Sequence, residues 1–104
     1  MNLTEQYLHV IRLAKKSLAS VKEVNIEMLT PKKAWDVVNT ASQARDLAIA
    51  RSHELGADLI ESQLDELDVT AYAELTKLQR TLEQVAYDLQ ATALMLSFDL
   101  RARR

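Results

Sequence analysis

The chain has 104 residues, of which 48% are hydrophobic, enough for one small all-helical domain spanning residues 1–104. It contains no cysteine, which excludes disulfide bonds, thiolate metal sites and cysteine catalysis. The formal net charge of −2 differs from the basic balance that a dominant nucleic-acid-binding domain normally shows. With one glycine and one proline, the chain has no glycine-rich phosphate loop and few turns.

The first predicted element is an amphipathic helix over residues 4–24. Its apolar residues recur at intervals of three and four, and charged residues occupy the opposite side. The apolar positions are Leu3, Tyr7, Val10, Ile11, Ala14, Leu18 and Val21. The connection that follows, residues 25–29, is short enough to favour an antiparallel second helix.

A second helix is predicted from Pro31 to Leu55. Thr30 before Pro31 is the arrangement of an N-cap and a first helical position, and Gly56 stands where a left-handed C-cap belongs. The inward positions are mostly alanine, which favours a middle helix in close contact with neighbours on two sides. These positions are Ala34, Val37, Val38, Ala41, Ala44, Ala48 and Leu55.

The remaining residues, 57–104, allow two interpretations. A leucine-rich heptad seam runs from Ala71 to Leu96, and another apolar stripe precedes it in the chain. Where the two stripes meet, the spacing of the apolar residues departs from the heptad pattern, and this fits either a continuous helix or a break near Asp68. A continuous helix over residues 58–100 would be about 65 Å long and would need a dimer to cover it. We therefore favour the break. The predicted fold is an all-α antiparallel bundle of three long helices, or of four if the third is broken.

Four acids follow 3-4-3 spacing and would share one helix face: Asp58, Glu61, Asp65 and Asp68. They resemble the D/E-x-x-D/E pairs with which all-helical nucleotide pyrophosphohydrolases hold Mg²⁺, a hard cation that prefers oxygen ligands. Such a site needs carboxylates from a second helix, and Asp46 and Glu54 do not form a comparable pair. We expect an acidic surface stripe without a metal or cofactor, paired with basic residues of the first two helices. These are Arg12, Lys15, Lys16, Arg45 and Arg51.

The histidines do not suggest catalysis either. His9 falls on the polar face of the first helix, and His53 falls in the last turn predicted for the second. Neither has a nucleophile or a carboxylate at a convincing spacing, so no catalytic residue is assigned.

The C-terminal helix carries more apolar surface than a three-helix monomer needs. Beside the leucine seam runs a second stripe with 4-3-4 spacing. With the methionine between its members, this stripe consists of Tyr87, Ala91, Leu94, Met95 and Phe98. Both seams could belong to the core, but we favour the second as an interface, because an apolar seam left in water is typical of an interaction surface.

The sequence thus favours a non-catalytic, cytoplasmic interaction module: a small adaptor, chaperone-like or regulatory subunit that forms a homodimer or docks on a protein partner. One alternative is a metal-dependent nucleotide hydrolase that uses residues 58–68. Another is a nucleic-acid-associated regulator whose tail, Arg101, Arg103 and Arg104, contacts phosphate; three bases are few for such binding. No stretch approaches the roughly 20 apolar residues of a membrane span, so no membrane association is expected.

Overall fold

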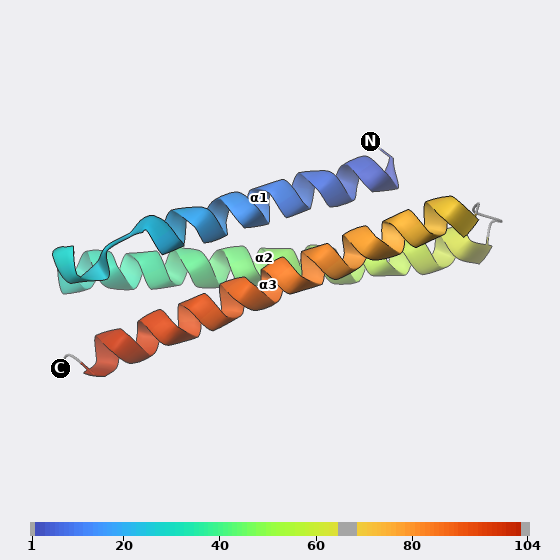
Figure 1. Cartoon of the computed structure of the whole chain (residues 1–104). Coiled ribbons are helices and arrows are strands. Elements are labelled where there is room, and N and C mark those ends of the chain that lie inside the picture. The colour runs from blue at the N-terminus through green and yellow to red at the C-terminus, as the bar shows by residue number, and fades with distance from the viewer. Residues whose placement is uncertain (1, 65–68, 103–104) are drawn as a thin grey trace.

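The computed structural model describes residues 2–64 and 69–102, without the side chains of Ile26 and residues 62–64. The helices are α1 (Leu3–Glu23), α2 (Pro31–Leu64) and α3 (Val69–Ala102), with a short 3₁₀ turn η1 (Ile26–Met28) between the first two. Successive helices run antiparallel (Figure 1). This confirms the predicted all-α antiparallel three-helix bundle, which is a rod of 56 × 17 × 17 Å.

Capping side chains define where α1 and α2 begin. The Asn2 side chain accepts a hydrogen bond of 2.8 Å from the backbone N–H of Glu5. The Thr30 hydroxyl accepts one of 3.3 Å from the N–H of Lys33. Each cap satisfies an N–H that has no partner inside its own helix, so the predicted Thr30 cap is confirmed.

The predicted end of the second helix is wrong. Gly56 does not cap α2, which continues to Leu64, and the backbone of Gly56 is not left-handed. Residues 57–64 therefore extend α2 instead of opening a third helix. The predicted break lies at Asp68, outside the described residues, and α3 begins just after it at Val69. Residues 58–100 accordingly do not form one helix.

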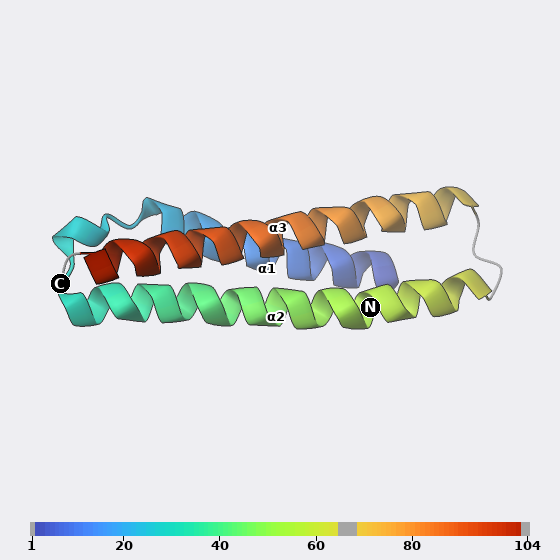
Figure 2. The same ribbon diagram turned by 90° about the horizontal axis from the view of Figure 1, so that it is seen from below.

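The three helices lie side by side (Figure 2), and buried side chains from all three form the core between them. The leucine seam of α3 is in it, with Leu75, Leu82, Val85 and Leu89 all buried. From α2, small residues such as Ala41 and Ala48 are buried against the other two helices, as predicted. Among the described residues, no helix is long and apolar enough to cross a bilayer.

The three helices differ in length, and this leaves one end of the rod thinner. α1 has 21 residues, whereas α2 and α3 have 34 each. The N-terminus of α1 stops short of the ends of α2 and α3 at Leu64 and Val69 (Figure 1). Leu59 and Leu75 are the buried residues nearest those two helix ends among the described side chains. Beyond them, among the described residues, the α1 ribbon no longer runs alongside α2 and α3 (Figure 1).

Candidate protein interface

The outward side of α3 carries a contiguous apolar surface, which we call the apolar face. It is formed by Tyr87, Ala91, Leu94, Met95 and Phe98. Tyr87, Leu94, Met95 and Phe98 are 66%, 45%, 68% and 62% exposed, and Ala91 is half-buried. Within the chain, these side chains are therefore not part of the core.

The apolar face and the core lie on opposite sides of the same helix. The buried residues Leu82, Leu89 and Ala93 point into the bundle. Around the helix axis, the residues of the apolar face are rotated from these buried residues by well over a quarter of a turn. Of the two sequence interpretations, the structure therefore supports the one in which the second stripe lies outside the single-chain core.

Polar and charged residues border the apolar face along two edges. Glu83, Gln90 and Arg101 follow one another at intervals of seven and eleven residues, about two and three turns, so they share one edge. Glu83 and Gln90 line the groove between α2 and α3, which identifies this edge as the one beside α2. In the described part of the chain, neither Glu83 nor Arg101 forms an ion pair.

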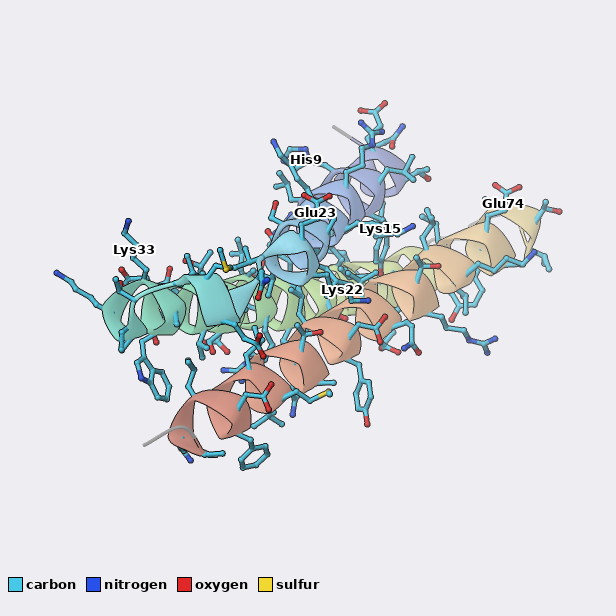
Figure 3. The ribbon with its side chains drawn as sticks, turned by 60° about the vertical axis from the view of Figure 1, so that its left-hand side comes forward. His9, Lys15, Lys22, Glu23, Lys33 and Glu74 are labelled. Atoms are coloured by element: carbon cyan, nitrogen blue, oxygen red, sulfur yellow. The ribbon has the colours of Figure 1, made fainter. Side chains whose placement is uncertain are left out.

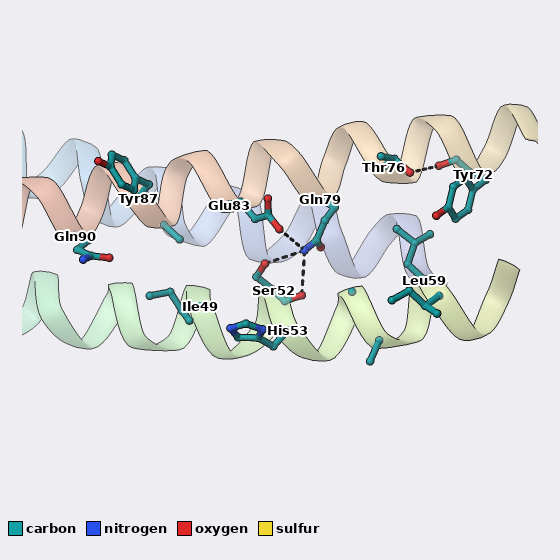
Figure 4. A pocket seen from close by; sticks show the side chains of 14 residues that line it. Ile49, Ser52, His53, Leu59, Tyr72, Thr76, Gln79, Glu83, Tyr87 and Gln90 are labelled. Carbon is teal, nitrogen blue, oxygen red and sulfur yellow. Dashed lines mark hydrogen bonds between the residues drawn. The ribbon is translucent and has the colours of Figure 1, made fainter.

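The groove between α2 and α3 has a volume of about 660 Å³. A polar bridge crosses its floor: Nε2 of Gln79 donates to the hydroxyl of Ser52 at 3.0 Å, to the carbonyl of Ser52 at 3.3 Å and to Glu83 at 3.0 Å (Figure 4). A Cβ at Gly56 would lie 3.3 Å from the same nitrogen. Gly56 therefore provides space for Gln79, a function that its place in the sequence does not reveal.

Beside this bridge, Tyr7 of α1 is completely buried. Its hydroxyl has no hydrogen-bond partner among the described residues, and neither has the buried Oε1 of Gln79. Burial, with the nearby negative charges of Asp58 and Glu83, raises the pKa of Tyr7 from 10.0 to about 12. The phenol is therefore neutral at ordinary pH and has no place as a catalytic base. It is a core residue, as the helical spacing predicted.

The acidic stripe is divided by the edge of the described structure. Asp58 and Glu61 are exposed on α2, whereas Asp65 and Asp68 lie outside the described residues. Residues 2–64 and 69–102 contain no group of three potential metal ligands close enough to hold an ion. Arg45 pairs with its neighbour Asp46 at 2.7 Å and not with the acidic stripe, so that prediction is wrong. A partner one residue away is within easier reach of a half-buried guanidinium.

The two histidines lie in different surroundings. His9 is exposed and points away from the side of α1 that carries Lys15 and Lys22 (Figure 3). His53 is not in a last helical turn, since α2 continues beyond it; it is exposed at the α2–α3 groove. Neither histidine forms a hydrogen bond or an ion pair with the described residues.

Comparisons with known proteins give no further guide to function. No protein-family model, curated protein or solved structure matches the chain.

Proposed function

We propose that the protein is a non-catalytic interaction module that self-associates through the apolar face of α3. The observation that carries the proposal is the exposure of Tyr87, Leu94, Met95 and Phe98 on one side of one helix. Large apolar side chains that gather in this way on a folded protein are typical of an interaction surface, and aromatic residues and methionine are enriched at such surfaces.

The shape of the bundle favours the same function. The core closes without the apolar face, because the leucine seam already packs α3 against α1 and α2. These side chains are therefore not needed to fold the chain, and covering them with a second surface would remove apolar area from water.

The test is the oligomeric state of the parent and of the variant Leu94→Glu/Phe98→Glu. We expect the parent to dimerise as its concentration rises from low micromolar to millimolar. We expect the variant to remain a helical, cooperatively melting monomer, because carboxylates at an interface centre lose their hydration. Light scattering coupled to size exclusion, with circular dichroism on the same fractions, measures both properties.

Two matched controls separate loss of the interface from other effects. Leu47→Glu places the same acid on an exposed leucine of α2, 61% exposed and outside the apolar face, and should leave the dimer intact. Leu82→Glu places it in the core and should abolish folding. A parent that stays monomeric at all concentrations would refute self-association. Loss of helicity in the Leu94/Phe98 variant would show that these two residues belong to the core and are needed for folding.

A further inference from the structure

We infer that two copies of the chain pair through α3 in an antiparallel orientation, with the two-fold axis midway between Ala91 and Leu94. The inference rests on the proposed self-association and adds its geometry. The 4-3-4 spacing of Tyr87, Ala91, Leu94 and Phe98 reads the same in both directions. An antiparallel copy can therefore place each of these four residues opposite another of the four.

The sizes of the facing side chains fit this register. Tyr87 lies opposite Phe98 of the second copy, which pairs two aromatic rings at each end of the contact. Ala91 lies opposite Leu94 of the second copy, so that the large leucine side chain fills the space beside the small alanine, as in well-packed cores. A parallel pair would place Ala91 against its own copy and leave the centre of the contact underfilled.

Charges along the edge beside α2 also favour the antiparallel pair. The two-fold axis keeps this edge of one helix next to the same edge of the other. Arg101 then lies within one residue of the level of Glu83 of the second copy, and the symmetry repeats the pair. A parallel pair would instead leave both Arg101 side chains at one end and both Glu83 side chains at the other.

The opposite edge carries Asp88 and Asp99. On a helix with 3.6 residues per turn, both project farther from the centre of the apolar face than Glu83 and Arg101 do. Across the contact, Asp88 and Asp99 are therefore farther apart than Glu83 and Arg101 are, and a repulsion weakens with distance. It is the edge beside α2 that favours the antiparallel orientation.

Cross-linking between introduced cysteines tests the orientation, and the absence of native cysteine makes the readout specific. Gln84 and Ala102 are both exposed and lie outside the apolar face. They are about 27 Å apart along the helix, but antiparallel pairing brings them within one residue of the same level. We expect a mixture of Gln84→Cys and Ala102→Cys to be joined by a short bis-maleimide at least tenfold faster than either variant with itself.

Each outcome of this experiment decides one question. Faster self-linking of either variant would overturn the antiparallel register while leaving self-association in place. Equal rates in the mixture and in the separate variants would show random collisions and would also overturn it. A monomeric parent, by contrast, would remove the proposed function together with this inference.

A charge exchange tests the edge contact separately. Arg101→Glu should weaken dimerisation about tenfold, since it replaces two symmetric attractions with repulsions. Adding Glu83→Lys to that variant should restore most of the affinity. Because Glu83 also accepts a hydrogen bond from Gln79, the Glu83→Lys single variant is the control for that loss. Additive weakening in the double variant would exclude the Glu83–Arg101 contact and overturn the register that predicts it.

Discussion

The side-chain nitrogen of Gln79 on α3 lies 3.0 Å from the hydroxyl oxygen of Ser52 on α2, at a level where both helices are otherwise packed by aliphatic side chains. Leucine and alanine contacts are not directional, so they do not by themselves prevent two helices from sliding by one turn. The Gln79–Ser52 hydrogen bond is directional, and Gly56 leaves room for it. This relationship therefore adds a directional contact to the alignment of α2 and α3.

A double-mutant cycle tests the link between Gly56 and Gln79. In a Gln79→Ala background, Gly56→Ala should stabilise the protein by about 0.5–1 kcal/mol, because alanine favours the helix interior. In the parent, the new methyl group crowds Nε2 of Gln79, so the gain should be smaller or reversed. Urea unfolding monitored by circular dichroism measures both effects. Equal effects in the two backgrounds would show that the two residues act independently.

The raised pKa of Tyr7 predicts how stability responds to alkaline pH. Between pH 10 and about 12 the unfolded chain releases the phenolic proton and the folded chain keeps it, so stability is fully present below pH 10 and falls as pH rises through this range. Tyr7→Phe should lose less stability there than the parent. At neutral pH its stability should match or exceed that of the parent, since the hydroxyl has no partner among the described residues. Identical alkaline losses in both proteins would contradict the assignment.

Two alanines of α2 should respond differently to enlargement. Ala48 is buried among the helices, so Ala48→Leu should destabilise the fold by about 1–3 kcal/mol. Ala44 is only half-buried and lines a groove between α1 and α2 beside Leu13 and Leu47. Ala44→Leu can extend into that groove and should cost less than half as much. Chemical denaturation of both variants makes the comparison, and equal losses would show that α1 covers Ala44 more tightly than the structure indicates.

The acidic stripe should not respond to divalent cations. Asp58 and Glu61 are exposed on a single helix, and two hydrated carboxylates hold Mg²⁺ weakly without ligands from a second element. We expect sub-millimolar Mg²⁺ to leave the melting temperature unchanged in the parent and in Asp58→Asn/Glu61→Gln. A saturable rise in the parent that the variant lacks would instead favour the hydrolase alternative.

The sequence predicted the helices well because helical periodicity and N-caps are local signals. Thr30 correctly indicated where α2 begins, and buried alanines such as Ala41 and Ala48 correctly indicated which side of it faces the core. The end of α2 could not be located in this way, since a glycine at position 56 fits a helix C-cap as well as it fits the helix interior that the structure has there. The glycine is explained only by the close approach of Gln79, 23 positions later in the chain. A contact between residues so far apart in the sequence produces no periodic pattern from which it could be predicted.

The candidate site was predictable as a pattern but not as an exposed surface. The 4-3-4 spacing identified Tyr87, Ala91, Leu94 and Phe98, yet the same spacing suits a buried seam. Deciding between the two requires the positions of α1 and α2 around α3. The Gln79–Ser52 bridge in the neighbouring groove had no sequence signal, because isolated serine and glutamine residues are common on helix surfaces.

The shortness of α1 has a consequence for how the protein opens. Amide protons near Leu64 and Val69 lie where two helices run side by side, whereas those near Leu82 and Leu89 lie where three helices pack together. Hydrogen exchange should therefore be fastest toward the ends of α2 and α3 at Leu64 and Val69, the tip of the rod, and slowest in its middle. Separation of the two helices at this tip should be the local opening that costs the least free energy. The apolar face lies at the other end of α3, so a dimer formed there would slow exchange around Leu94 and leave the tip free to open.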